Sequence, residues 1–190
     1  MTGMSADLSR VEVLGQTIMG IMTAMGEYSS IAKSILRQNS IRSIEPDAWY
    51  PMAVCLAAVE TIGERVGEHT LFVIGKRVPE NVVWPPHIRA IDEVLDFIDI
   101  AYHSTHRLDG AVLYDPASGV MKEGIGHYRH QKQGPRRSVM VCDTPFPSEF
   151  DRGLILEVAR QFKPDAEVSL DDTKPTRKGG ALSCTYIVSW

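Results

Sequence analysis

The segment VCDTPFPSEFDRGLILEVARQF, residues 141–162, runs from a β-branched stretch through a corner that holds two prolines and into an amphipathic pattern. Pro145 and Pro147 each fix their own φ and bias the residue before them toward an extended backbone, so the corner is stiff. Cys142 stands at the strand end just before this corner. The segment therefore predicts a strand, a rigid corner and a helix over 148–162.

The start of that helix carries the spacing of a capping box. Ser148 is followed three residues later by Asp151. In a capping box the Ser side chain satisfies an unpaired backbone N–H, and an acidic group near the first turn is favourable with the helix dipole. We therefore expect both residues to act at the helix N-terminus.

Helical periodicity dominates the chain before this segment. Apolar residues alternate at spacings of three and four along residues 11–38, which predicts one long helix. The same spacing over 49–66 predicts a second helix, and residues 71–74 predict a short one. A further amphipathic helix begins at Ile91 and ends near Gly110, with acidic residues on its far side. Residues 39–110 therefore predict a helical layer.

The period then changes from helical to alternating. Four strands are expected between Gly, Pro and Asp signals, at 119–130, 136–142, 166–170 and 181–190. The predicted fold class is α+β, with an N-terminal helical layer packed on a C-terminal antiparallel four-stranded sheet over 111–190 that has one inserted helix, 148–162. Residues 1–190 are expected to form a single domain.

Composition excludes several classes of protein. The 190 residues are 44% hydrophobic and 23% charged, which is typical of a globular domain, and the net charge of −4 gives no basic footprint for nucleic acid. We find no apolar run of about 18 residues and no leader, so we expect a cytoplasmic protein without a membrane span. Three cysteines without CxxC spacing indicate reduced thiols.

The last strand alternates cleanly. Cys184, Tyr186, Val188 and Trp190 fall on one face, so Cys184 is expected to point into the protein and to meet Cys142 on one side of the sheet. Free cysteines are usually small buried hydrophobes, and this interpretation is favoured over metal ligation.

The order of these elements, the corner with Phe150, Asp151 and Gly153, and the closing pattern from Gly179 to Trp190 resemble a superfamily of small ligand-binding domains. It includes the haem-nitric-oxide-binding (H-NOX-like) domains, the 4-vinyl reductase domains and the transport protein particle subunits. The resemblance covers most of the chain from about the second helix onward. It implies an apolar pocket between helices and sheet, often in a dimeric protein with a sensory or carrier role.

The resemblance also bears on cofactors. Similar phenol-sensing activators hold zinc with several Cys and a Glu. Cys142 and Cys184 match two of those positions, but residues 171–178 offer no cysteine. Even with Asp171, the set of zinc ligands is therefore incomplete. Haem-binding relatives carry a proximal histidine and a tyrosine–serine–arginine motif at the corner that clamps the haem propionates. CDTPFP occupies this corner, so the resemblance disfavours haem.

Four histidines lie in the predicted helix from Ile91 and in the strand that follows it. His106 falls at the edge of the apolar stripe of its helix and His103 well off it. A histidine in this position is more often a cation at the C-terminus of a helix than a haem ligand, and we expect this of His106. His127 and His130 fall on opposite faces of a strand and are expected to form a solvated edge with Arg129.

Two function classes stay open. The favoured one is a stand-alone sensor domain for a small apolar molecule, and its expected lining residues are Trp49, Trp84, His106, Phe150 and Tyr186. The alternatives are an assembly subunit of the same fold without ligand and a haem-binding gas sensor. Hydrolase, nucleotide-binding and metalloprotease motifs are absent, so an enzyme is disfavoured. The apolar stripe of residues 11–38 predicts a homodimer interface, with pairing inside one chain as the equal alternative.

Overall fold

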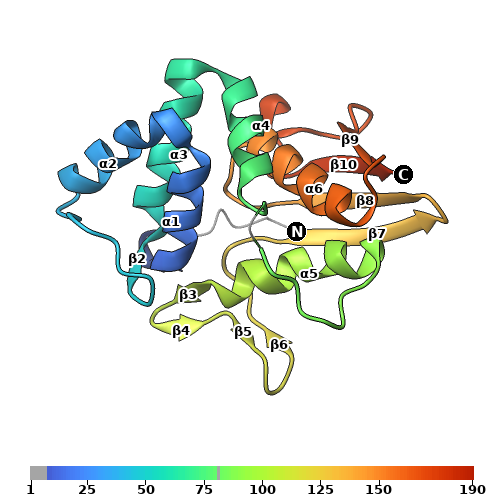
Figure 1. The fold of residues 1–190 in the computed structure, drawn as a ribbon, viewed down its shortest axis with the longest axis horizontal. Helices are drawn as coiled ribbons and strands as arrows, with labels where there is room; N and C mark the ends of the chain where they lie inside the picture. The colour runs from blue at the N-terminus through green and yellow to red at the C-terminus, as the bar shows by residue number, and fades with distance from the viewer. Residues whose placement is uncertain (1–7, 81) are drawn as a thin grey trace.

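The computed structural model describes residues 8–80 and 82–190, which form an α+β fold with antiparallel sheets (Figure 1). The helices are α1 (Gly15–Ala24), α2 (Ser29–Gln38), α3 (Met52–Val66), α4 (Glu68–Arg77), α5 (Ile91–Ser104) and α6 (Ser148–Phe162). The strands are β1 (Val11–Leu14), β2 (Trp49–Pro51), β3 (His106–Leu108), β4 (Ala111–Val112), β5 (Tyr114–Asp115), β6 (Val120–Met121), β7 (Tyr128–Gly134), β8 (Arg137–Cys142), β9 (Glu167–Leu170) and β10 (Cys184–Ser189). Single 3₁₀ turns are η1 (Leu8–Arg10), η2 (Gly26–Tyr28) and η3 (Arg177–Gly179). The described residues contain no helix with the length and apolar character that a membrane span requires.

The C-terminal half matches the expected strand, corner and helix. β7, β8, β10 and β9 form an antiparallel sheet in that order, and α6 is inserted between β8 and β9. Three of its strands lie where the alternation predicted them, but the first covers Tyr128–Gly134 instead of 119–130. Part of the earlier stretch forms β6, because the glycines Gly124 and Gly126 adopt positive φ and turn the chain before β7 begins.

The prediction of one helix over 11–38 is wrong. Residues Val11–Leu14 form β1, which pairs antiparallel with β2 and β3, and the helical remainder is divided into α1 and α2. Val11 and Val13 are buried while their neighbours are half-exposed, which is the alternation of a strand. Gly26, at φ +54°, turns the chain between the two helices.

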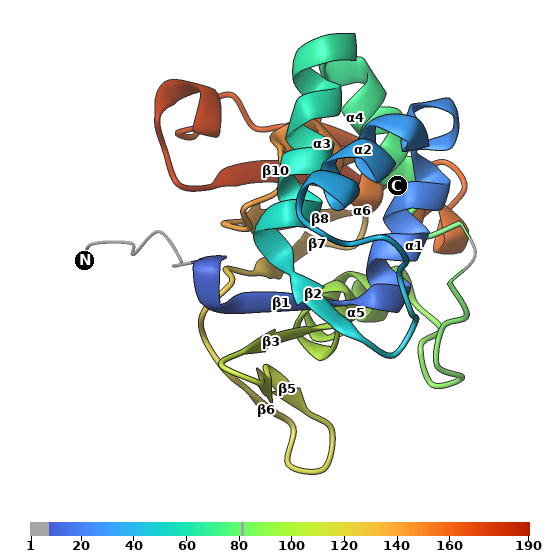
Figure 2. The same cartoon turned by 90° about the vertical axis from the view of Figure 1, so that its left-hand side faces the viewer.

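A second sheet therefore exists that the sequence did not predict, in the order β2, β1, β3, β4 (Figure 2). The helix expected from residue 49 begins at Met52 instead, because Trp49–Pro51 pair with β1 as β2. The helix expected to reach Gly110 ends at Ser104, and β3 follows it. Figure 2 shows the β5–β6 hairpin projecting from this end of the molecule.

The apolar stripe of residues 11–38 packs inside the chain. Ile18, Ile21, Met25 and Ala32 are at most 3% exposed and belong to the same core as α3 and α4. The pairing within one chain is thus present, and the stripe is not free to act as an intermolecular seam. A homodimer remains a prediction, but the apolar stripe of residues 11–38 does not support it.

Two glycines let the helical half meet the C-terminal half. α4 packs against α6, and the two helices lie side by side in the centre of Figure 1. A Cβ added to Gly153 of α6 would lie 2.1 Å from the carbonyl oxygen of Phe72, and one added to Gly75 of α4 would lie 2.1 Å from that of Phe150. Each glycine therefore allows the backbone of the other helix to approach, which no other residue permits at this distance.

We expect Gly153→Ala to lower the free energy of unfolding by roughly 1–3 kcal/mol or more, because the new methyl forces two backbones apart. Gly20→Ala is the matched control: it lies in α1, nothing surrounds its Cβ position within 4 Å, and it should raise that free energy by about 0.5–1 kcal/mol. Urea unfolding followed by circular dichroism measures both. Equal effects of the two substitutions would contradict the close approach of α4 and α6.

Candidate functional site

A cavity of about 570 Å³ lies between the helical half and the C-terminal half. It is lined by residues of α1, α4, the segment after α4, α5, β3, β7, the corner before α6, and α6. The apolar part of its wall comprises Ile21, Ile98, Tyr102, Phe146, Phe150 and Val158. Its size and apolar character are typical of a small-molecule site.

His106 is the distinctive polar group in this wall. It is 1% exposed, and its Nδ1 lies 2.7 Å from the carbonyl oxygen of Tyr102, to which it donates in the neutral tautomer this contact selects. Its Nε2 is buried and has no hydrogen-bond partner among the described residues. Burial lowers the pKa of His106 to about 4. His106 is therefore a neutral imidazole with a free electron pair, and the expectation of a cation at the helix C-terminus is wrong.

The structure places the five expected lining residues in different surroundings. Trp84, His106 and Phe150 line the cavity. Trp49 lies outside it on β2, where the Arg107 guanidinium stands 4.8 Å from its ring centre. Tyr186 also lies outside it, wholly buried in β10. The sequence did not single out two further tyrosines of the wall, Tyr102 and Tyr128.

A buried ion pair lies behind the corner. Asp151 is fully buried and accepts hydrogen bonds from Tyr128 at 2.6 Å, Thr144 at 3.0 Å and Arg177 at 3.0 Å. Arg177 also donates to the carbonyl oxygens of Cys142 and Thr144. Burial raises the pKa of Asp151 to about 6, although Arg177 and these hydrogen bonds favour the carboxylate. The predicted capping box is therefore wrong: Asp151 holds the corner and the turn at Arg177 together, and α6 has no side-chain cap.

Cys142 and Cys184 lie directly opposite each other on β8 and β10, and both are buried. The Cys184 sulfur lies 3.2 Å from Ser148 Oγ and accepts the Arg177 N–H at 3.4 Å. Burial raises the pKa of the Cys142 thiol well above its usual value. Within the described part of the chain neither thiol belongs to a group of three metal-binding side chains. Zinc binding by this pair remains a prediction.

The histidines near the start of β7 face α5, which corrects the expected solvated edge. His127 Nδ1 lies 2.8 Å from Asp99, His130 Nδ1 lies 2.8 Å from Asp96, and both imidazoles are less than 10% exposed. The acidic side of α5 is therefore turned toward β7 and not toward solvent alone. His103, expected well off the buried face, is fully buried beside them.

Comparison with solved structures identifies the class of fold. The chain is similar to an H-NOX protein from S. oneidensis in the Fe(II) ligation state, with 12% identity, a TM-score of 0.63, and coverage of 93% of this chain and 95% of that one. It is also similar to a mutant Fe(II) unliganded H-NOX protein from K. algicida, with 14% identity, a TM-score of 0.58 and the same coverage. No protein-family model and no curated protein matches the sequence. At these identities the likeness shows the fold alone: the chain has an H-NOX-like fold.

We expect Arg177→Met to lower the free energy of unfolding by roughly 3–5 kcal/mol at pH 7, because it leaves the buried Asp151 carboxyl without its counter-charge. Lys178→Met is the control on the same turn; its ion pair with Glu68 is exposed on both sides and should contribute at most about 1 kcal/mol. Urea unfolding of both variants tests this. A cost for Arg177→Met no larger than that of the control would contradict the structural role of the pair.

The neutral state of His106 predicts a pH dependence. Its pKa is lowered to about 4 from a usual 6.5, so between these values the unfolded chain binds more protons than the folded one, and the free energy of unfolding falls as pH falls. From pH 7 to pH 4.5 wild type should lose about 2 kcal/mol more than His106→Gln. Urea unfolding at the two pH values measures the difference, and replacement of exposed His69 by Gln should retain the wild-type loss. Equal losses for wild type and His106→Gln would refute the assignment.

Proposed function

We propose that this chain is a ligand-binding sensor domain and that haem occupies its cavity. The observation that carries the proposal is the free Nε2 of His106, which is buried in the wall of an apolar cavity. A buried nitrogen without a partner costs free energy, and a ligand that accepts its electron pair removes that cost. The cavity also favours a ligand-binding domain over an assembly subunit without ligand.

The surroundings of His106 suit an axial ligand. Metal-bound histidines usually donate their other ring N–H to a carbonyl or carboxylate, and His106 Nδ1 has such a partner in Tyr102. Its lowered pKa keeps the imidazole in the neutral form that binds metals. If haem were bound here, His106 would hold it, and its iron would supply a centre for binding a diatomic gas.

Other residues of the wall would position such a ligand. Phe146 and Phe150 stack at 4.8 Å between ring centres and offer flat apolar surface. Arg77 also lines the cavity and can pair with the carboxylate of a bound ligand. Arg177 at the corner is committed to Asp151, which agrees with the missing propionate clamp. Solved structures similar to this chain include an Fe(II) H-NOX protein and an H-NOX protein in the Fe(II)NO ligation state.

We also infer a cytoplasmic location, because Cys55, Cys142 and Cys184 are free and buried, as in proteins of reducing compartments. The net charge of −4 still speaks against a nucleic acid partner.

Haem titration tests the proposal. We expect the purified protein to bind one equivalent of haem and to show a Soret band, because His106 supplies the axial nitrogen. In His106→Gly the band should weaken and shift, and added imidazole should restore it by entering the space of the lost side chain. His130 does not line the cavity, and His130→Gln should bind haem as wild type does. Absence of a Soret band after reconstitution, or an unchanged spectrum in His106→Gly, would refute haem binding at this site.

A further inference from the structure

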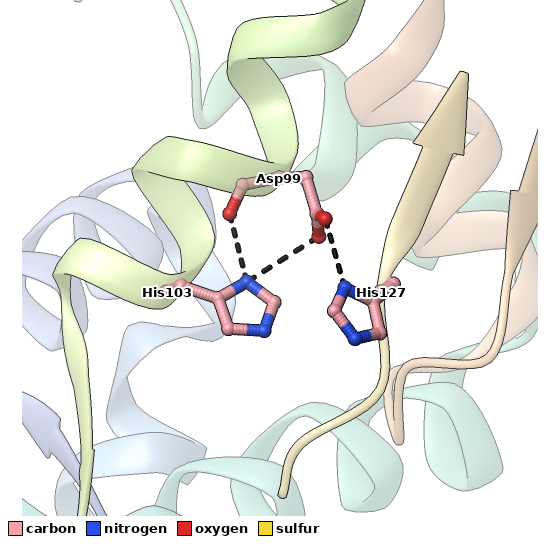
Figure 3. A group of neighbouring side chains, drawn as sticks. All are labelled: Asp99, His103 and His127. Carbon is pink, nitrogen blue, oxygen red and sulfur yellow. Dashed lines mark hydrogen bonds and ion pairs between the residues drawn. The ribbon is translucent and has the colours of Figure 1, made fainter. Parts of the chain in front are cut away.

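A second group of metal-binding side chains lies apart from the cavity, where α5 meets the chain just before β7. It consists of Asp99, His103 and His127, and none of the three lines the cavity (Figure 3). Asp99 and His103 stand one helical turn apart on the same face of α5, and His127 approaches from the opposite side. One donor atom of each residue lies within 4.8 Å of the other two.

Both imidazoles turn the same nitrogen toward Asp99. His127 Nδ1 lies 2.8 Å from Asp99 Oδ2, and His103 Nδ1 lies 3.4 Å from Asp99 Oδ1 and 2.9 Å from its carbonyl oxygen. The rings stack, with centres 4.6 Å apart and planes at 30°. Within residues 8–80 and 82–190 the polar contacts of the His103 ring are confined to Asp99, since its Nε2 has no partner.

The two ring nitrogens of His127 both face carboxylate acceptors. His127 meets a carboxylate at each nitrogen, Asp99 at Nδ1 and Glu123 at 2.9 Å from Nε2. It can satisfy both only as an imidazolium, unless a metal ion replaces the proton at one of them.

We propose that Asp99, His103 and His127 bind a divalent transition metal ion of the zinc class through the Asp99 carboxylate and the two Nδ1 atoms. The ion replaces the proton that His103 Nδ1 donates to the Asp99 carbonyl oxygen. Donors bound to one tetrahedral zinc, at about 2.0–2.2 Å from the ion, lie about 3.3 Å from each other. His127 Nδ1 lies 2.8 Å from Asp99 Oδ2 and His103 Nδ1 lies 3.4 Å from Asp99 Oδ1, so each imidazole nitrogen stands near that spacing from one of the two carboxylate oxygens. Three protein ligands leave a fourth position for water.

Neighbouring groups supply outer-shell partners for two of the three ligands, His127 and Asp99. Metal binding at His127 Nδ1 leaves the ring proton on Nε2, where Glu123 accepts it. The backbone N–H of Tyr128 donates to Asp99 Oδ1 at 2.9 Å and fixes the carboxylate. Glu123 and Asp99 together bring two negative charges to a divalent ion. Glu123 is 84% exposed, so the ion can enter from solvent on this side.

The test uses the full chain, freed of metal by a chelator and free of haem, and titrates it with Zn²⁺ by calorimetry with elemental analysis of the bound metal. We expect one equivalent to bind. Asp99→Asn and His127→Gln should weaken binding by more than about 100-fold because each removes a direct ligand, whereas Glu123→Gln should weaken it by about 10-fold as an outer-shell change. His130→Gln is the matched control, because His130 also pairs with a carboxylate of α5 but has no second imidazole beside it; it should bind as wild type does.

Co²⁺ separates this site from the cysteine pair. A cobalt complex with nitrogen and oxygen donors shows d–d bands without thiolate-to-cobalt charge transfer, which is the expected result. Charge-transfer bands, failure to bind one equivalent of zinc, or wild-type affinity in folded His127→Gln or Asp99→Asn would each overturn the proposal. Circular dichroism verifies that each variant is folded. One folded variant, Asp99→Asn or His127→Gln, is sufficient for the test. Because these measurements need no haem, failure of haem binding leaves the zinc result unaffected.

Discussion

The contact between α4 and α6 through Gly75 and Gly153 holds the two halves of the molecule together. At this crossing the backbone of one helix rests on the other, with no side chain between them. The cavity lies beside this crossing: Arg77 of α4 and Phe150, Leu154 and Val158 of α6 belong to its wall.

The helix α5 has an acidic side and an apolar side with different partners. Asp92, Asp96 and Asp99 of the acidic side contact Lys132 and His130 of β7 and His127 just before it. The apolar side faces the cavity and the core. His106 lies in the cavity wall. The two proposed sites therefore share one scaffold: the acidic side of α5 would hold zinc, and His106, just beyond its end, would hold haem.

Burial shifts the pKa of several ionisable groups among the described residues, and three of them concern the sites discussed above. It keeps His106 neutral, raises the pKa of Asp151 and raises that of the Cys142 thiol. The outcome differs with the partners available. Asp151 has Arg177 and two hydroxyl donors and acts as a structural anchor, whereas His106 has a partner at one nitrogen only and is left able to bind a ligand.

The sequence by itself determined the elements whose pattern is long and local: the α+β class, α3, α5 and α6, and the strands β8, β9 and β10 with the facing of Cys142 and Cys184. Hydrophobic periodicity reports which side of a long element is buried, so these predictions needed no knowledge of partners. Only the tertiary structure decided β1 and β2, because strands of three or four residues are stabilised by pairing with distant segments. Only the tertiary structure also decided the burial of His103, His106 and Asp151, the pKa of His106 and Asp151, and their roles. These properties depend on groups of other elements, and the sequence does not show which distant residues lie close in space.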